Sequence, residues 1–393
     1  MSLHHSIARL LINTPMSLAD LQLATQVSLP TLRRAVQELS DARWVRIVGQ
    51  AEANGGRPAM LFGVDDSLFV IIGVHLQLPG MRLILSDLTG QVLEETELFD
   101  RAVPTPHEAV QEVVDYVARI RTSFAQRQVL GIGIATPGFI DLDSGDIISI
   151  GRVPTWESFP LCRRLQAALN LPVHIANDVD CMAFAELQYA HEPRESNLAY
   201  IGFDEGVKVS LFLKGGLYKG TLGNAGLMAA HLLQVRDLPN PEDAPRLLTI
   251  NGVNRIFEER LARLDEATQQ RYANIVATVS PRERVSMILA GAHADMPLCH
   301  AIVQEQSKAL AVAAANVILM VQPDIIVIGG LLSLMPRSLY TVLEAEIRRY
   351  LPELISNNTI FQQGRLASQN SAAIGANHHF LQVYLDAATG DPA

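Results

Sequence analysis

Residues 171–180 read LPVHIANDVD, a short apolar strand that runs directly into an amide and two carboxylates. In α/β proteins, ligands bind outside the carboxyl ends of parallel strands, so a polar side chain in that position is a candidate contact. Asn177 and Asp178 occupy this position. We therefore predict a strand, a following helix and a ligand-binding pair at their junction. A carboxylate that serves only as a helix N-cap would give the same pattern, and this alternative stays open.

The sequence on either side of this segment shows the same order of elements twice. The first half is predicted to contain strands over 69–76, 81–85 and 91–95, a helix over 106–121 and a strand over 129–135. The second half is predicted to contain strands over 198–202 and 208–213, a hairpin tail over 215–220, a helix near 301–321 and a strand over 324–330. Two halves with the same order of strands and helices, on either side of a cleft, predict an α/β protein. Its predicted fold is the two-lobed actin-like (ribonuclease H-like) ATPase-type fold.

The first 64 residues follow a different pattern, which is typical of a DNA-binding module. Capped apolar stripes predict helices over 6–12, 17–24 and 29–39, followed by strands over 44–48 and 60–62 with a glycine-rich connection. Three helices and a two-stranded wing make a winged helix-turn-helix. Its third helix is expected in the major groove, with its N-terminal residues at the base edges.

Candidate DNA contacts lie on the third helix and on the wing. The helix contributes the polar residues that its apolar stripe leaves exposed: Ser28, Pro30, Thr31, Arg33, Arg34 and Gln37. The wing contributes Arg46 and Arg57, and we expect Arg57 at its tip to meet phosphate or the minor groove. Other small helical domains also carry capped helices and a few solvent-facing arginines, so these residues have an alternative, purely structural interpretation.

Charge is distributed unevenly along the chain. The net charge of −10 argues against a protein that binds nucleic acid over its whole surface. Residues 1–62 carry six basic and four acidic side chains, a balance of +2 that leaves −12 for the remainder. The positive excess therefore coincides with the predicted DNA-binding module.

Composition indicates the class of protein and its compartment. With 49% hydrophobic and 18% charged residues, the 393-residue chain is predicted to form two or three well-packed domains. Its three cysteines form no CxxC pair, which is typical of free thiols in a reducing compartment. No signal-like stretch begins the chain, and the apolar run over 309–321 is shorter than the roughly 20 residues of a membrane span. We expect a cytoplasmic protein without a membrane partner.

Short motifs along nearly the whole length make the chain resemble the ROK family (repressors, open reading frames and sugar kinases), specifically its winged-helix transcriptional regulators. The matching motifs, specific through their order, lie at 55–58, 87–90, 131–138, 156–161, 171–180, 216–220, 322–330 and 374–376. The resemblance implies a winged helix-turn-helix over 1–64, a first α/β lobe over 65–196 that includes a C-terminal helix over 378–393, and a second lobe over 197–377. It also implies a homodimer or a higher homo-oligomer.

Both loops that hold ATP in ROK kinases differ in this chain. The kinases place Asp-x-Gly-Gly-Thr after the first strand, where glycines let backbone amides approach the phosphates, whereas residues 75–79 read HLQLP. The second loop, a Gly-Thr-Gly-type turn in the kinases, corresponds to DEGVK at 204–208, whose two carboxylates would repel a triphosphate. We therefore predict no kinase activity, no catalytic residue and no cofactor. A sugar kinase with an appended DNA-binding domain is the alternative.

The sugar-binding residues of the family are only partly kept. The resemblance implies that Asn177 and Asp178 bind sugar hydroxyls, and Gly138 and His231 complete the predicted effector contacts. In the companion hydroxyl-binding motif, Leu227 replaces a Glu and the His is absent or displaced by one residue, to His231. The family's zinc cluster has no counterpart, because residues 247–260 contain no cysteine, so no metal is predicted.

Together these observations predict a transcriptional regulator, a repressor of carbohydrate-related genes, that binds a double-stranded DNA operator. A sugar or sugar derivative in the cleft would favour one arrangement of the lobes and thereby alter DNA binding, which requires different affinities for the two arrangements. A regulator controlled by a protein partner, with a relic cleft, is a second alternative.

Overall fold

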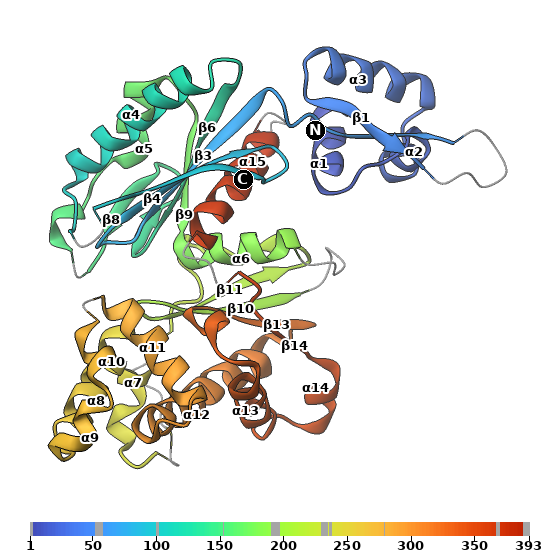
Figure 1. Ribbon diagram of the computed structural model, residues 1–393. Coiled ribbons are helices and arrows are strands. Elements are labelled where there is room, and N and C mark those ends of the chain that lie inside the picture. The colour runs from blue at the N-terminus through green and yellow to red at the C-terminus, as the bar shows by residue number, and fades with distance from the viewer. Residues whose placement is uncertain are drawn as a thin grey trace. The chain divides into compact units, whose positions relative to one another are not determined.

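The computed structural model describes residues 3–51, 58–99, 102–151, 153–189, 197–228, 235, 238–278, 280–366 and 370–387. The chain divides into two compact units, Met1–Gln188 together with Asn370–Ala393, and Tyr189–Gln369 (Figure 1). The chain re-enters the first unit at Asn370 rather than at 378, because the C-terminal helix α15 (Ser371–Ala387) begins earlier than the sequence suggested.

The first unit is built on a five-stranded sheet with the order β5-β4-β3-β6-β9. Its strands are β3 (Phe69–Leu76), β4 (Met81–Asp87), β5 (Val92–Leu98), β6 (Gln128–Thr136) and β9 (Val173–Asn177). The first three form an antiparallel meander, and β6 and β9 continue from β3 in parallel. The meander and the strands that follow it occur along the chain as predicted, and the structure adds their parallel pairing and their order in the sheet.

Helices cover both faces of this sheet (Figure 1). The helices α4 (Pro106–Ser123) and α5 (Leu161–Leu169) share one hydrophobic cluster with the strands, and α15 packs on the other face. Glycines in the apolar strands allow α15 to approach closely: a Cβ atom on Gly133 would lie 2.0 Å from the carbonyl oxygen of Ala376. A small hairpin, β7 (Phe139–Asp141) and β8 (Asp146–Ser149), and the short helix η1 (Pro154–Trp156) lie between β6 and α5 along the chain.

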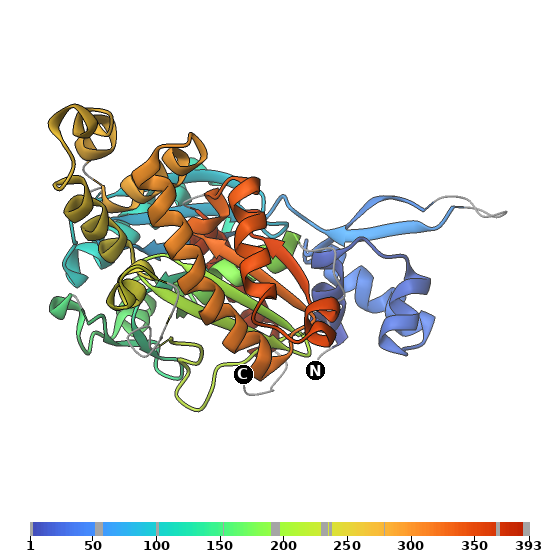
Figure 2. The same ribbon diagram turned by 90° about the horizontal axis from the view of Figure 1, so that it is seen from below.

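The second unit repeats the same plan, which confirms the predicted duplication. Its sheet has the order β12-β11-β10-β13-β14, with an antiparallel meander followed by parallel strands. The strands are β10 (Leu198–Phe203), β11 (Val207–Leu213), β12 (Gly216–Leu217), β13 (Ile325–Gly330) and β14 (Ile360–Gln363). The long helices α11 (Pro281–His293), α12 (Pro297–Val321) and α13 (Arg337–Arg348) pack beside one another and contribute to its core (Figure 2).

Shorter helices complete the second unit. They are η3 (Pro241–Asp243), α7 (Ala244–Leu247), α8 (Ile250–Leu261), α9 (Glu266–Gln270), α10 (Ala273–Ala277), η4 (Leu331–Leu334) and α14 (Glu353–Asn358). Within the described residues, no helix alone has the length and apolarity of a membrane span; only α11 and α12 taken together do, and they are bent by 104°.

The N-terminal module has the three helices and the hairpin that the sequence predicts. These are α1 (Leu3–Asn13), α2 (Leu18–Thr25), α3 (Leu29–Asp41) and the antiparallel strands β1 (Val45–Gln50) and β2 (Met60–Val64). Ser17 begins α2 with a reciprocal capping box to Asp20, and Gln26 ends it in the left-handed conformation, at a φ of 57°. The hairpin extends away from the helices (Figure 2).

The hydrophobic core of the N-terminal module continues into the rest of the first unit. Ile7, Leu32 and Val45 belong to one buried cluster with Phe380 and Leu385 of α15. The ring of Trp44 lies 4.8 Å from that of Phe69 and stacks on that of Tyr384 at 6.2 Å. The module is therefore packed against α15 by apolar and aromatic contacts.

Candidate DNA-reading module and effector site

The predicted contact residues of α3 all face solvent. Leu32, Ala35, Val36 and Leu39 form the buried stripe of the helix. The opposite face exposes Ser28, Pro30, Thr31, Arg33, Arg34 and Gln37. An amphipathic helix that follows a tight turn and exposes its polar face has the arrangement of a recognition helix.

The N-terminus of α3 has no side-chain cap. Ser28 is the N-cap residue in extended conformation, but its hydroxyl makes no hydrogen bond to the helix backbone. Its Oγ lies 2.8 Å from Oγ1 of Thr31 instead. The first-turn amides of this helix are therefore not occupied by the Ser28 side chain, and such amides are suited to a DNA phosphate.

The two arginines of α3 have different surroundings. Nε of Arg34 donates to Oε1 of Glu38 at 2.9 Å, one helical turn away, and 83% of the Arg34 side chain is exposed. The hydrogen bond from Arg34 holds the pKa of Glu38 below its usual range, and His4 acts in the same direction. Arg33 forms no ion pair with any described residue and is exposed at the surface.

Two contact residues were predicted on the wing, and one of them lies in the described part of the chain. Arg46 on β1 forms an ion pair with Asp66, with 3.1 Å between Nη2 and Oδ2. This pair holds Arg46 near the base of the hairpin. Arg57, the predicted tip residue, lies outside the described residues.

Asn177 and Asp178 lie at the junction that the sequence predicts. Asn177 ends β9, Asp178 begins α6 (Asp178–Tyr189), and both side chains are buried. The backbone amide of Val179 donates to Oδ1 of Asn177 at 3.0 Å and to Oδ1 of Asp178 at 2.8 Å. The two side chains therefore converge on one amide. The helix-capping alternative is therefore borne out by the geometry at this junction.

The neighbouring strand ends at the same edge of the sheet. Thr136 of β6 pairs with Asn177 in the parallel register and is fully buried. Gly138 follows at a φ of +87°, where a Cβ atom would lie 2.3 Å from the carbonyl oxygen of Ser149. Gly138 is thus required by the turn itself. His231, the remaining predicted effector contact, lies outside the described residues.

Residues 75–79 correspond to the first phosphate-binding loop of the kinases. The backbone amides of this loop form hydrogen bonds within the protein. The amides of Gln77 and Leu78 both donate to the carbonyl oxygen of Gly80, at 3.1 and 3.2 Å. The amide of Gly80 donates to the carbonyl oxygen of Ala102 at 3.0 Å, and Pro79 has no amide hydrogen. The loop therefore presents no free row of amides that could bind a phosphate.

The second loop contains an ion pair that the sequence did not reveal. The carboxylate of Asp204 is paired with the guanidinium of Arg282 on α11, and the amide of Asp204 closes a turn to the carbonyl oxygen of Gly206 at 2.9 Å. The charge of Asp204 is therefore balanced within the protein. With its closed turn and its ion-paired carboxylate, this segment does not resemble a phosphate-binding loop.

Leu227 is half-exposed where the family resemblance expects a glutamate. The preceding Gly226 accepts a hydrogen bond from the amide of Val209 at 2.9 Å, and a Cβ atom on it would lie 1.7 Å from the Val209 carbonyl oxygen. Leu227 itself forms a bridge to Lys208 and is 51% exposed. An apolar surface therefore replaces a carboxylate at this position. Among the described residues, no group of three or more His, Cys, Asp and Glu side chains is placed to hold a metal ion.

A model of the ROK family matches residues 71–383. The chain belongs to the ROK family. It is 23% identical to the xylose repressor of Caldicellulosiruptor bescii, over 76% of this chain and 75% of that protein. It is 26% identical to a transcriptional regulator of Mycobacterium tuberculosis, over 78% of this chain and 69% of that protein.

Solved structures of ROK proteins share the fold. A ROK family transcriptional regulator described as a homologue of Escherichia coli Mlc matches with a TM-score of 0.75 and 20% identity, over 97% of this chain and 98% of that one. A ROK glucokinase from Streptomyces griseus, solved with glucose and AMPPNP, matches with a TM-score of 0.61 and 17% identity, over 78% of this chain and 98% of that one. The match to the regulator thus extends over a larger share of this chain than the match to the kinase.

Proposed function

We propose that this ROK protein is a DNA-binding repressor of carbohydrate-related genes, controlled by a sugar or sugar derivative. The observation that carries the proposal is the exposed polar face of α3, which follows a tight turn in a winged helix-turn-helix. The named relatives support it, since they are repressors and transcriptional regulators. Arg33 and Arg34 would contact the operator, and the first-turn amides of α3 would bind phosphate.

The same proposal includes the absence of phosphoryl transfer. Kinases of this fold stabilise the transferred phosphoryl group with backbone amides and a metal ion. Here the amides of Gln77, Leu78 and Gly80 are engaged within the protein, and Asp204 is bound to Arg282. An ATP-dependent turnover of xylose or glucose by the purified protein, lost in Asp178→Asn, would instead establish a kinase.

The effector would bind at the carboxyl edge of the first sheet, against Asn177 and Asp178. Their oxygen atoms already accept from the Val179 amide and would accept further hydrogen bonds from sugar hydroxyls. Gly138 shapes the adjoining turn. Because several relatives are named xylose repressors, xylose is the first sugar to test.

Helix α15 offers a direct route from this edge to the DNA-binding module. A Cβ atom on Gly375 would lie 1.6 Å from the Cys181 carbonyl oxygen, so α15 touches the backbone of α6. The ring of His379 lies 5.2 Å from that of Phe184, also on α6. Further along α15, Tyr384 stacks on Trp44 and Asp386 pairs with Arg9 of α1. A displacement of α6 on ligand binding would therefore be transmitted to the module.

The substitution Asp178→Asn tests the effector site without removing the helix cap. An asparagine Oδ1 can still accept from the Val179 amide, so we expect the free energy of unfolding to change by less than about 1 kcal/mol. Operator affinity, measured by fluorescence anisotropy with DNA selected by the full chain, should be retained. Release of that DNA by xylose or another active sugar should be lost.

Two results would contradict this assignment. Full sugar response in Asp178→Asn would remove the effector role of Asp178. No response of the wild-type protein to any sugar in a broad panel, together with normal operator binding, would favour control by a protein partner.

A further inference from the structure

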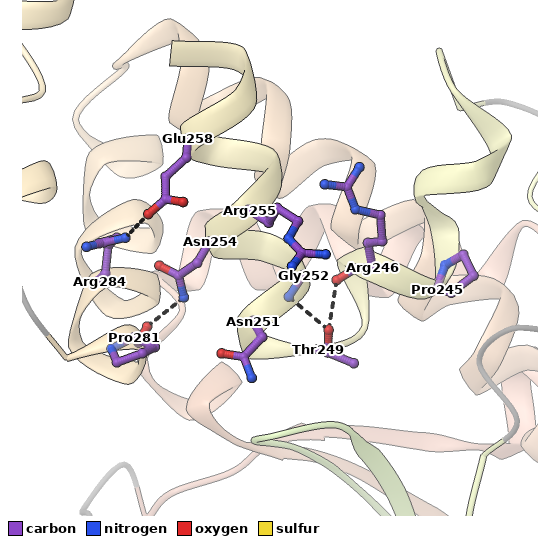
Figure 3. Close-up of a pocket in the computed structure, with 10 residues that line it drawn as sticks. All are labelled: Pro245, Arg246, Thr249, Asn251, Gly252, Asn254, Arg255, Glu258, Pro281 and Arg284. Carbon is purple, nitrogen blue, oxygen red and sulfur yellow. Dashed lines mark hydrogen bonds and ion pairs between the residues drawn. The ribbon is translucent and has the colours of Figure 1, made fainter. Parts of the chain in front are cut away.

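A cavity of about 620 Å³ lies wholly within the second unit, where the helices α7, α8 and α11 meet (Figure 3). Its walls carry three arginines, Arg246, Arg255 and Arg284, with Glu258 as the one carboxylate. Cavities of this size accommodate small molecules. Because none of the residues assigned above to the DNA or to the effector lines it, this cavity is a separate feature of the protein.

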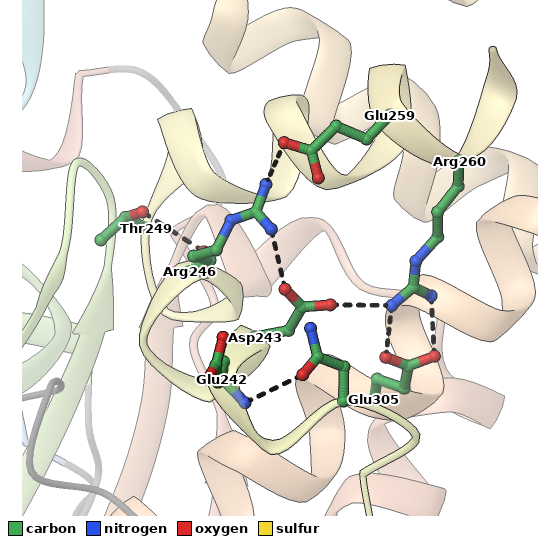
Figure 4. A network of polar contacts seen from close by, with 8 residues as sticks. Glu242, Asp243, Arg246, Thr249, Glu259, Arg260 and Glu305 are labelled. Carbon is green, nitrogen blue, oxygen red and sulfur yellow. Dashed lines mark hydrogen bonds and ion pairs between the residues drawn. The ribbon is translucent and has the colours of Figure 1, made fainter.

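Two of the three arginines are held in place by acidic partners. Nη1 of Arg246 lies 2.8 Å from Oδ1 of Asp243, and Nη2 lies 2.7 Å from Oε1 of Glu259. Asp243 also contacts Arg260, which forms two 2.7 Å hydrogen bonds to Glu305 (Figure 4). This network fixes the position of Arg246. The guanidinium of Arg284 is similarly fixed by Glu258 (Figure 3). It also donates to the carbonyl oxygen of Thr278 at 2.9 Å.

Arg255 is the uncompensated positive charge of the cavity. It is exposed and forms no ion pair with any described residue. It projects from the first turns of α8, whose N-cap Thr249 accepts a hydrogen bond from the Gly252 amide at 3.0 Å. The amides of Ile250 and Asn251 have no acceptor among the described residues. A guanidinium beside open helix amides is suited to an anion.

Asn254 provides an independent indication of a ligand. The residue is only 6% exposed, and its Nδ2 donates to the carbonyl oxygens of Ile250 and Pro281, both at 2.9 Å. Its Oδ1 is buried and accepts no hydrogen bond. Figure 3 shows this amide on the cavity wall, between Pro281 and the Glu258–Arg284 pair. Buried acceptors are normally satisfied, so a donor is missing here, and a ligand hydroxyl would supply it.

We propose that this cavity binds a small phosphorylated sugar or polyol. The phosphate would lie against Arg255 and the amino end of α8, and a hydroxyl would donate to Oδ1 of Asn254. A neutral sugar would leave the Arg255 charge uncompensated. A metal cation would be repelled by the three guanidinium groups. The protein would then sense a phosphorylated metabolite at this site in addition to the effector proposed above, and the assignment does not depend on DNA binding.

The test measures binding of glucose 6-phosphate, ribose 5-phosphate and glycerol 3-phosphate to the full chain by isothermal titration calorimetry. Inorganic phosphate, glucose and ATP serve as comparison compounds. We expect saturable binding of at least one sugar or polyol phosphate, and at least tenfold weaker binding of it by Arg255→Gln. The matched control is Arg263→Gln, which makes the same change at an exposed arginine beyond the end of α8 and outside the cavity.

Several results would overturn the proposal. These are the absence of saturable binding of all three phosphorylated probes, equal affinity in Arg255→Gln, and tighter binding of ATP or neutral glucose that Arg255→Gln weakens. An equal loss in Arg263→Gln would show that general surface charge is responsible. Because Arg255 is exposed, its replacement should leave the melting temperature of the unliganded protein unchanged. Binding of the phosphorylated probe should persist in Asp178→Asn, which separates this site from the proposed effector site.

Discussion

At the scale of single residues, Arg34 is a proposed DNA contact that folding should not require. Its pair with Glu38 is highly exposed, and such pairs contribute only about 0–1 kcal/mol to folding. We therefore predict that Arg34→Ala leaves stability nearly unchanged but weakens operator binding by about 1–3 kcal/mol. Fluorescence anisotropy at one fixed salt concentration measures the loss.

Arg43→Ala is the matched control for this experiment. Arg43 is also exposed in the N-terminal module, but it follows α3 and its guanidinium donates to Ser67 at 2.8 Å. It should retain operator affinity. Equal losses in the two variants would mean that overall charge, and not the α3 surface, determines binding. Repeating the titration over a range of salt concentrations distinguishes phosphate contact from base contact, since only a lost phosphate contact lowers the salt dependence by about one ion.

His378 on α15 predicts a specific dependence of stability on pH. Burial lowers its pKa to about 4, and its Nε2 is enclosed without a partner. In the unfolded chain a histidine titrates near 6.5, so between these two values the unfolded state binds more protons and stability falls as the pH falls. The wild-type protein should therefore lose about 2 kcal/mol more than His378→Gln between pH 7 and pH 5.

Urea denaturation at several pH values measures this difference. His107→Gln, a change at an exposed histidine of the same unit, should leave the pH dependence of the wild type intact. Parallel stability curves for the wild type and His378→Gln would show that His378 is not protonated on unfolding in this range.

Some single residues of the proposed sites could be predicted from the sequence, and others could not. The position of Asn177 and Asp178 at a strand end followed from the apolar run before them and is confirmed. The partner of Asp204 could not be predicted, because Arg282 comes from a helix far along the chain. Likewise, the sequence HLQLP excluded a glycine-rich loop, but it did not show that the amides of Gln77 and Leu78 both turn onto Gly80.

At the scale of elements, α15 joins the first sheet, α6 and the N-terminal module. It begins at Ser371, and Gly375 meets the Cys181 carbonyl oxygen on α6. Alanine favours a helix over glycine by about 1 kcal/mol, but an added Cβ only 1.6 Å from a backbone oxygen must displace one of the two helices. We therefore predict that Gly375→Ala destabilises the protein by about 1–3 kcal/mol net and reduces the sugar response of operator binding.

Gly151→Ala is the control for this variant, since a Cβ atom at Gly151 meets nothing within 4 Å. It should change stability by less than about 1 kcal/mol. Thermal unfolding and operator release by the active sugar are the two measurements. Wild-type stability and response in Gly375→Ala would refute the tight α6–α15 contact and the route through it.

Element boundaries were predicted well where local signals mark them and poorly where they do not. α2 begins at the Ser17 capping box and ends at the left-handed turn of Gln26, close to the predicted bounds, and the two predicted wing strands are present. The start of α15 was missed although Asn370 and Ser371 are typical N-cap residues, because the small residues after them show no amphipathic stripe. Its boundary depends on packing against β3 and β6, which only the folded protein shows.

At the scale of the whole molecule, the duplicated sheets explain how one fold can serve kinases and regulators. Both halves keep the meander and the parallel strands, so the scaffold does not depend on the phosphate-binding loops. Those loops connect strands at the surface and can change without disturbing either core. The sequence predicted this duplication from its order of elements, and the shared arrangement is confirmed.

The assembly state gives the last prediction. One winged helix recognises one short site, so a homodimer should bind two half-sites related by two-fold symmetry and separated by whole turns of DNA. Inserting about five base pairs between the half-sites places them on opposite faces of the duplex and should lower affinity at least tenfold, whereas about ten base pairs should restore most of it. Analytical ultracentrifugation of the full chain alone and on these DNAs measures the stoichiometry. Equal affinity for all spacings with one protein chain per DNA would show that the protein binds as a monomer.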